Sequence, residues 1–193
     1  MRIISGNHKG RMLRPPEGLL VRPTTDMAKE SLFNILNNYV DFEEIRVLDL
    51  FAGTGNISME FAARDAKLVM SVELNSRCTD YISKMAAELK FTNLTVIKAN
   101  VLTFLARPSG SYDVIFADPP YDMADREKVP ALVFENNWLA DEGYFVMEHD
   151  KHLSFKTHPF FAEERQYGKI HFTFFRKAAP EAEDGNAPVV PII

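Results

Sequence analysis

The most chemically specific residues of this chain are Asp118, Pro119, Pro120 and Tyr121, which directly follow an apolar run at residues 112–117. An apolar run of this length bounded by turn residues predicts a buried strand. In an open α/β sheet, ligands bind beyond the carboxyl ends of the strands. A carboxylate, a rigid diproline and an aromatic ring at that place suit the binding of a flat group that carries an NH2 and reacts at its nitrogen.

A turn that contains two glycines follows the first predicted strand, at residues 46–51, and precedes a helix. Glycine at such a turn lets a ligand approach the backbone and the free N–H groups at the start of the helix. The second predicted strand, at 68–72, is followed by Glu73, which lies twenty positions beyond Gly53. An acid at about that spacing accepts hydrogen bonds from ribose hydroxyls. The pattern therefore predicts a ligand that contains a ribose.

The same region does not fit a dinucleotide. The G-x-G-x-x-G pattern needs glycine at position 58, which is Ser58. Asp49 would repel a pyrophosphate but attracts an amino group, and the amide of Asn100, after the third predicted strand, can recognise adenine. A ligand with a ribose, an adenine and an amino acid but no phosphate is S-adenosylmethionine. The residues expected to bind it are Asp49, Phe51, Ala52, Gly53, Thr54, Gly55, Asn56, Glu73, Leu74, Asn100 and Val101, with Thr24 and Thr25 as further candidates.

A helix is predicted from a threonine cap at 24–25 to about Tyr39, because its apolar residues recur at helical spacing. Lys29 lies off this apolar stripe. Together with Arg22 and Thr24, it either lines the methionine end of the cofactor site or serves only the start of the helix.

The other predicted elements alternate between strand and helix and end in a hairpin. They are helices at 57–64, from a Ser76 cap to about Lys90, and at 129–137, with strands at 94–97, 112–117, 143–147, 165–167 and 170–175. This order predicts an α/β fold with a mostly parallel, doubly wound sheet and an antiparallel edge.

The ends of the chain differ from the middle. Residues 1–23 form a basic arm with a small predicted hairpin, residues 24–177 the main domain, and residues 178–193 an acidic tail that we expect to be disordered. The arm carries five basic residues against one acidic residue, although the whole chain has a formal charge of −5. Contact with phosphates and simple solvation both explain such an arm. Its basic residues are Arg2, Lys9, Arg11, Arg14 and Arg22.

Cys78 is the only cysteine, so the sequence predicts neither a disulfide framework nor a cysteine-rich metal site. It falls on the apolar stripe of a predicted helix, which argues against the nucleophilic cysteine that methylation of cytosine at carbon 5 requires. The start of the chain lacks the apolar stretch of a signal peptide, and no run is long enough to span a membrane. We therefore expect a cytoplasmic protein.

Taken together, these motifs resemble class I methyltransferases that modify exocyclic amines, and more narrowly the RsmD-type 16S ribosomal RNA guanine-N2 methyltransferases. The resemblance covers roughly residues 2–177. Its motifs are Arg2-Ile3-Ile4-x-Gly6, Lys9-Gly10-Arg11, Arg22-Pro23-Thr24-Thr25-Asp26, Phe51-Ala52-Gly53-Thr54-Gly55, Ala99-Asn100-Val101, Asp118-Pro119-Pro120-Tyr121 and Trp138-Leu139-Ala140.

The resemblance implies a seven-stranded Rossmann-like fold, S-adenosylmethionine as cofactor, and catalytic roles for Asp118, Pro119, Pro120 and Tyr121. It also implies a guanine of 16S ribosomal RNA as substrate, presented on an assembled small subunit to a monomeric enzyme without a metal. The Asp-Pro-Pro-Tyr element leaves other acceptors open, namely adenine N6 in DNA or RNA and a glutamine amide in a protein. Glutamine-directed relatives favour Asn at position 118. A further alternative is a cofactor-binding ribosome-assembly factor.

Overall fold

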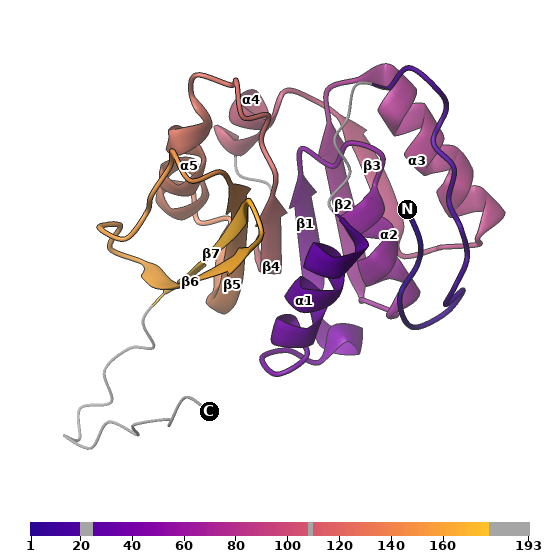
Figure 1. Ribbon diagram of the computed structural model, residues 1–193, viewed down its shortest axis with the longest axis horizontal. Coiled ribbons are helices and arrows are strands. Elements are labelled where there is room, and N and C mark those ends of the chain that lie inside the picture. The colour runs from indigo at the N-terminus through magenta and orange to yellow at the C-terminus, as the bar shows by residue number, and fades with distance from the viewer. Residues whose placement is uncertain (20–24, 108–109, 178–193) are drawn as a thin grey trace.

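The computed structural model describes residues 1–19, 25–107 and 110–177, and within them a seven-stranded sheet forms the centre of the fold (Figure 1). The strand order is β3-β2-β1-β4-β5-β7-β6. The first five strands are parallel, and β7 runs antiparallel to both β5 and β6. The strands are β1 (Arg46–Leu50), β2 (Leu68–Glu73), β3 (Leu94–Lys98), β4 (Tyr112–Ala117), β5 (Leu139–His149), β6 (Phe161–Tyr167) and β7 (Ile170–Arg176).

Helices cover both faces of this sheet. They are α1 (Asp26–Leu36), α2 (Asn56–Ala63), α3 (Ser76–Glu88), α4 (Val101–Leu105) and α5 (Val129–Glu135), with short 3-10 turns η1 (Phe42–Glu44) and η2 (Arg126–Lys128). The helices α1 and α2 pack on one face, and α4 and α5 pack on the other. Among the described residues, no helix combines the length and apolar character that a membrane span needs.

Alternate residues of each central strand enter the two cores. Val47 and Val114 are buried against α1 and α2, whereas Leu48 and Ile115 are buried on the α4 and α5 side. Burial on both faces explains why these strands are almost continuous apolar runs in the sequence. The chain builds β1, β2 and β3 outward in one direction and then places β4 on the other side of β1. The carboxyl ends of β1 and β4 therefore meet at the switch point where such sheets bind ligands.

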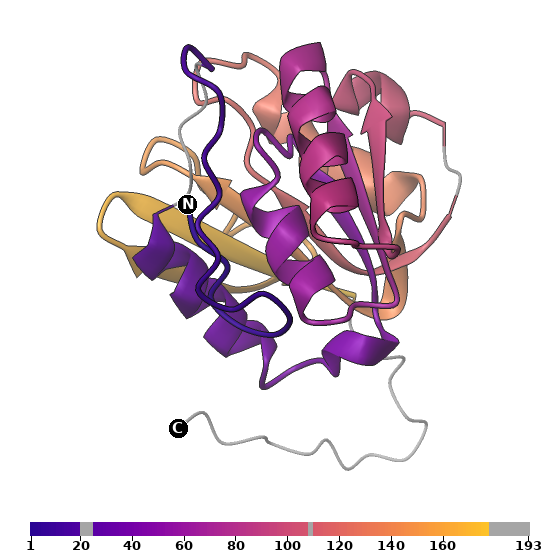
Figure 2. The same ribbon diagram turned by 90° about the vertical axis from the view of Figure 1, so that its right-hand side faces the viewer.

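The basic arm forms the predicted small hairpin, closed by an antiparallel bridge between Arg2 and Met12. Ile3 and Leu13 are buried in a third apolar cluster, between the arm and helices α2 and α3. Figure 2 shows the arm, in indigo, on the side of the sheet that helices α1 and α2 cover. The close approach depends on Gly6, which has φ +67° and where a Cβ would lie 1.9 Å from the carbonyl oxygen of Ala63.

A buried carboxylate fastens the arm to the domain. The Glu60 carboxylate accepts from the backbone N–H groups of Ile4 and Ser5, at 2.8 and 3.0 Å. The same carboxylate lies 3.2 Å from the Lys29 ammonium and 3.2 Å from the Arg64 guanidinium. Glu60 and Lys29 are both almost completely buried. The arm is thus held by charge-assisted hydrogen bonds in the interior, which are stronger than neutral ones.

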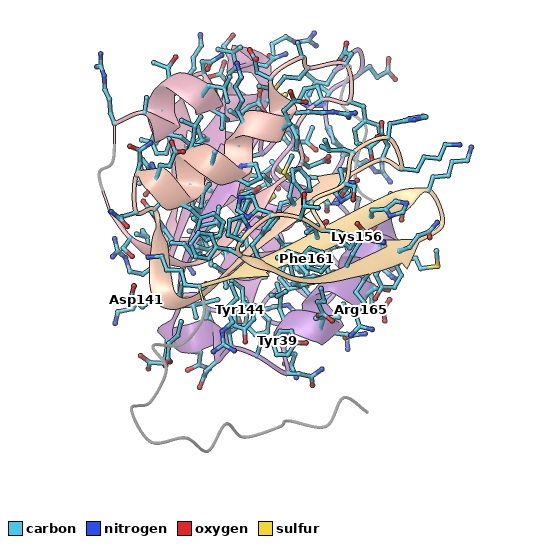
Figure 3. The ribbon with its side chains drawn as sticks, turned by 90° about the vertical axis from the view of Figure 1, so that its left-hand side faces the viewer. Tyr39, Asp141, Tyr144, Lys156, Phe161 and Arg165 are labelled. Atoms are coloured by element: carbon cyan, nitrogen blue, oxygen red, sulfur yellow. The ribbon has the colours of Figure 1, made fainter. Side chains whose placement is uncertain are left out.

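At the other end of the sheet, aromatic stacking ties β5 to the turn after α1. The rings of Tyr39 and Tyr144 stack with centroids 4.9 Å apart and an interplanar angle of 5° (Figure 3). The Tyr39 hydroxyl donates to Glu163 of β6 at 3.1 Å, and the Arg176 guanidinium lies over the Tyr144 ring, 5.1 Å from its centroid. The antiparallel strands therefore belong to the same body as the parallel ones.

The predicted elements are present, with differences at several ends. The N-cap of α3 is Asn75, whose side chain accepts from the backbone N–H of Arg77 at 2.9 Å; the predicted Ser76 cap was wrong. The helix α1 begins after its Thr25 cap and ends at Leu36 rather than near Tyr39. The strands β5 and β6 are longer than predicted, and α4 was not predicted. The predicted disordered tail at 178–193 lies outside the described residues.

Candidate functional site

One cavity of about 990 Å³ lies at the carboxyl ends of the parallel strands. Its walls combine the strand ends with the starts of the following helices, as the sequence predicts for a switch-point site. It brings together most of the residues predicted to bind the cofactor and all four residues of the Asp-Pro-Pro-Tyr motif. These are Asp49, Phe51, Ala52, Gly53, Thr54, Asn56, Glu73, Leu74, Asn100, Val101, Asp118, Pro119, Pro120 and Tyr121.

The glycine turn bends across the ends of β1 and β2. Phe51, Gly53 and Gly55 all have positive φ, at 59°, 55° and 75°. The Gly53 N–H donates to the Glu73 carboxylate at 2.8 Å, which fixes this acid at the rim of the cavity. Gly55 is the N-cap of α2 and does not line the cavity. A Cβ at position 55 would lie 2.8 Å from the Ile82 side chain, so this glycine is needed for packing against α3.

Asp49 is a buried acid in the cavity wall, with 2% of its surface exposed. Burial raises the pKa of its carboxyl to about 7, against the opposing effect of its hydrogen bond with Ser58. The Ser58 hydroxyl donates to Asp49, and the Ser71 hydroxyl donates to Ser58 at 2.5 Å. The serine that breaks the dinucleotide pattern therefore orients the acid. A ligand ammonium beside Asp49 would stabilise its charged form.

Asn100 lies between β3 and α4, where it caps the helix and also faces the cavity. Its side-chain oxygen accepts from the backbone N–H of Thr103 at 3.1 Å, so the residue caps α4. It also lines the cavity, next to Val101. The predicted bond from adenine N6 would share an oxygen that the cap already uses, which an amide oxygen with two lone pairs permits.

The part of the cavity wall that holds the Asp-Pro-Pro-Tyr motif is built from the end of β4 and its neighbour β5. The motif leaves β4 at Asp118, and a turn closes where the Met123 N–H donates to the Pro120 carbonyl at 3.0 Å. The Tyr121 hydroxyl donates to the Glu148 carboxylate at 3.5 Å. Glu148 is 3% exposed and lines the cavity together with Asp118.

A cationic side chain holds the ring of Tyr121. The Arg126 guanidinium lies over this ring, 5.7 Å from its centroid. Arg126 also forms an ion pair with Asp150 at 3.3 Å, and both side chains are mostly buried. The pKa of the Asp150 carboxyl is lowered: burial opposes the shift, but the His152 N–H and Arg126 favour the charged form more strongly. The guanidinium is therefore anchored by Asp150 while it contacts the ring.

Several residues considered for the cofactor site lie elsewhere. Of the two alternatives for Lys29, the structure does not support a place at the methionine end, because Lys29 does not line the cavity. It is buried and donates to the Arg2 carbonyl at 2.6 Å and to the Asn56 side chain at 2.9 Å. Thr25 caps α1 by accepting from the Ala28 N–H at 3.2 Å and is also absent from the wall. Thr24 and Arg22 lie outside the described residues.

The basic residues in the described part of the arm, Arg2, Lys9, Arg11 and Arg14, do not line the cavity. Arg11 forms an exposed ion pair with Glu88 at 2.9 Å, and Arg2 approaches Asp26 at 3.8 Å. Lys9 and Arg14 are exposed.

Sequence reasoning missed several residues of the wall, of which Glu148 and Lys98 are charged. A signal for Glu148 was available, since it is an acid that directly follows the apolar run at residues 143–147. In the described part of the chain, no group of three or more His, Cys, Asp or Glu side chains is placed to hold a metal ion.

Comparison with known proteins gives a consistent result. A family model described as "Conserved hypothetical protein 95" matches residues 1–176. The chain is 30% identical over 189 residues to "Ribosomal RNA small subunit methyltransferase D" of Escherichia coli strain K12, covering 96% of this chain and 94% of that protein. The protein of the same name from Haemophilus influenzae is 36% identical over 155 residues, covering 78% and 79%.

A solved structure extends this likeness to three dimensions. The "Putative methyltransferase yhhF from Escherichia coli" superposes with a TM-score of 0.79 at 32% sequence identity, covering 93% of this chain and 99% of that one. The likeness therefore covers nearly the whole of both chains.

Proposed function

The chain belongs to the Conserved hypothetical protein 95 family, and from this premise we propose that it is an S-adenosylmethionine-dependent methyltransferase. Its substrate is the exocyclic N2 amine of a guanine in 16S ribosomal RNA of the small subunit. The names of its relatives support ribosomal RNA as the substrate. The guanine and its amine rest on the resemblance of the arm and the motifs.

One observation carries the proposal: a single cavity holds both halves of the predicted reaction. The acids Asp49 and Glu73 lie in the same wall as Asp118 and Tyr121. The first pair suits the amino group and the ribose of the cofactor, and the second pair suits a flat amine. No rearrangement of the sheet is needed to bring the two halves together.

The cofactor residues fit S-adenosylmethionine in charge and position. Asp49, buried and held by Ser58, would bind the ammonium of the methionine part. Glu73, held by Gly53, would accept from the ribose hydroxyls, and Asn100 would contact the adenine. When bound, this cofactor would supply an electrophilic methyl group: the amine nitrogen would bond to the methyl carbon as the bond from that carbon to sulfur breaks, which would leave S-adenosylhomocysteine and one proton.

Asp118 and the Pro119 carbonyl prepare the amine for this displacement. Because the lone pair of the N2 amine is delocalised into the ring, the amine is a poor nucleophile. Two acceptors for its N–H bonds draw the nitrogen towards tetrahedral geometry, and the lone pair can then point at the methyl group. Positioning of this kind accounts for much of the rate in such transfers. Asp118 takes the released proton or passes it to water.

Tyr121 holds the base. Stacking of a base on an aromatic side chain contributes about 1–3 kcal/mol, and Arg126 keeps the ring in place. Because the reacting groups line a cavity, the target nucleotide must leave its own stack to enter. The basic arm, fastened to the domain by Glu60 and Lys29, contacts the phosphates of the surrounding RNA. The protein acts as a cytoplasmic monomer on an assembled small subunit.

The test is methyl transfer from labelled S-adenosylmethionine to naked 16S ribosomal RNA and to small subunits that lack the modification, followed by nucleoside analysis. We expect N2-methylguanosine, formed on the assembled subunit. N6-methyladenosine, or methylation of protein, would contradict the base assignment. The variant Asp118→Ala should bind the cofactor and transfer no methyl group. If Asp118→Ala still supported subunit assembly, the protein would have a role beyond catalysis.

A further inference from the structure

We propose that Glu148 selects guanine over other amine-bearing bases, by accepting a hydrogen bond from the ring N1–H beside the reactive amine. This inference rests on the proposed function and adds to it the residue that determines the base. The Asp-Pro-Pro-Tyr motif by itself serves any flat amine. A second group is needed to recognise the ring nitrogen next to that amine.

The fold places Glu148 beside Asp118. In the parallel pair of β4 and β5, Ala117 is opposite Met147. Asp118 directly follows Ala117 at the end of β4, and Glu148 directly follows Met147 on β5, so both residues lie at the same edge of the sheet. Both line the one cavity. The chain therefore places two carboxylates, from the ends of neighbouring strands, in the same cavity.

Burial of the Glu148 carboxylate among apolar side chains lowers the stability of the folded protein. It is 3% exposed, and its partner on β7 is Phe172, which is fully buried. Val146, two residues earlier on the same face, belongs to the apolar core. An apolar residue would pack here without the free energy that burial of a charge requires. A charged group retained at a ligand cavity despite this cost indicates a function in that cavity.

The carboxylate of Glu148 is in contact with Tyr121. The Tyr121 hydroxyl donates to one oxygen, Oε1, at 3.5 Å, and an ionised carboxylate can accept about four hydrogen bonds. The same bond ties Glu148 to the ring expected to stack on the base. A base stacked on Tyr121 and held by Asp118 would therefore present its edge to Glu148.

Guanine is the only common acceptor whose edge matches two adjacent carboxylates. Beside its N2 amine lies N1–H, a second donor. Beside the amine of adenine lies the unprotonated N1, beside that of cytosine lies N3, and beside the amide nitrogen of glutamine lies a carbonyl oxygen. Each of these is an acceptor. Since a carboxylate only accepts, Glu148 would bind guanine N1–H and would repel the lone pair of the others.

The experiment compares guanine with 2-aminopurine at the target position of 16S ribosomal RNA, ligated from a synthetic segment and reconstituted into small subunits. The base 2-aminopurine keeps the amine at carbon 2 but has an unprotonated N1. The wild-type enzyme should favour guanine in kcat/KM by roughly tenfold or more, the usual discrimination of one well-placed base contact. In Glu148→Gln this ratio should fall at least tenfold, because the glutamine amide can donate to N1. Differences in intrinsic reactivity between the two bases cancel in this comparison.

Two variants serve as controls. Glu142→Gln makes the same substitution at an exposed position of the same strand, away from the cavity, and should keep the wild-type ratio. Tyr121→Phe removes the hydroxyl that contacts Glu148 and keeps the ring. An unchanged ratio in this variant supports direct reading of the base by Glu148, whereas a ratio as low as that of Glu148→Gln would mean that Glu148 acts only by positioning Tyr121.

Failure of this inference differs from failure of the proposed function. If the wild-type enzyme makes N2-methylguanosine but Glu148→Gln keeps the wild-type ratio, Glu148 does not read the base. If Glu148→Gln does not fold, Glu148→Ala takes its place, because it also removes the carboxylate, and a wild-type ratio in Glu148→Ala overturns the inference. If the wild-type enzyme makes no N2-methylguanosine, the proposed function is wrong, and the inference is overturned with it.

Discussion

The ammonium of Lys29 lies 3.2 Å from the carboxylate of Glu60, and both side chains are at most 1% exposed. This ion pair connects the arm with the wall of the cavity. The carboxylate binds the backbone of the arm, while the ammonium also binds Asn56 in the cavity wall at 2.9 Å. Burial lowers the pKa of Lys29, and Glu60 acts in the opposite direction. The position of the arm is therefore linked to the shape of the cofactor site.

Removal of the charge of Glu60 should release the arm. In Glu60→Gln the Lys29 ammonium stays buried without its counter-ion, and loss of one partner of a buried pair costs about 3–5 kcal/mol. We expect the free energy of unfolding, measured in urea, to fall by about that amount, and limited proteolysis to cleave the arm first. Glu88→Gln, which breaks the exposed pair with Arg11, should cost at most about 1 kcal/mol. Similar losses in the two variants would contradict a special role for Glu60.

Loss of the Arg126 side chain should impair catalysis while cofactor binding persists. Arg126→Met removes the guanidinium that covers Tyr121 and pairs with Asp150. Because the ring then has more freedom, we expect kcat/KM for the RNA to fall roughly tenfold, a loss of about 1.4 kcal/mol. The dissociation constant of S-adenosylmethionine, measured by calorimetry, should change little. Asp150→Asn should act through Arg126, so the double variant should be no worse than Arg126→Met.

The matched control for this prediction is Lys128→Met. Lys128 belongs to the same 3-10 turn and pairs with Asp125 at 2.7 Å, but it is exposed. Its loss should leave kcat/KM near the wild-type value. Equal effects of Arg126→Met and Lys128→Met would show that general charge, rather than the contact with Tyr121, determines the rate.

The central sheet could be predicted from the sequence because its strands are buried on both faces. Such strands are apolar runs with polar residues at their ends, and the parallel arrangement brings these ends together. The ends of helices were harder to predict. The cap of α3 is Asn75 and not the predicted Ser76. Asn and Ser both cap helices well, so the residue types alone could not show which of the two neighbours is the cap. The short α4 was missed because a five-residue helix carries too little periodicity.

The position of a site residue could be predicted where its own strand determines that position. It could not be predicted where contacts with residues far away in the sequence determine it. Asp49, Glu73 and Asp118 follow from their places at strand ends. The place of Lys29 does not, because it is set by Glu60 on another helix and by the backbone of the arm. The position of Glu148 near the Asp-Pro-Pro-Tyr motif likewise depends on the register of β5 beside β4, which the sequence does not show.

Neutralising a single charge of the arm should lower the salt dependence of RNA binding. Arg14 is exposed, so it is available for a phosphate without breaking an interior contact. Removal of one contact with a phosphate reduces the slope of log K against log salt by about 0.7–0.9. We expect Arg14→Gln to show that reduction, with weaker binding at low salt. Lys67→Gln, at an exposed position between α2 and β2, should leave the slope unchanged. An unchanged slope in Arg14→Gln would mean that its charge is only solvated.

The raised pKa of Asp49 predicts how the stability of the cofactor-free protein depends on pH. Burial raises this pKa from 3.8 to about 7, so folding favours the protonated acid. The contribution of Asp49 to stability is therefore fully present below about pH 4 and is lost as the pH rises through 7. At pH 8 the ionised group costs of the order of 4 kcal/mol. Asp49→Asn should thus raise the free energy of unfolding at pH 8 and have a smaller effect at pH 5.

Ionisation of Asp49 should lower the stability of the cofactor-free protein but raise its affinity for the cofactor. The ammonium of S-adenosylmethionine binds the ionised form of Asp49, so affinity should rise up to tenfold per pH unit below 7 and level off above it. An α-amino group loses its own proton near pH 8, so the optimum should lie between these values. Calorimetry in buffers with different ionisation enthalpies should detect a proton released on binding at pH 6. Asp49→Asn should bind weakly and release no such proton. A variant that kept the wild-type pH profile would show that Asp49 does not bind the ammonium.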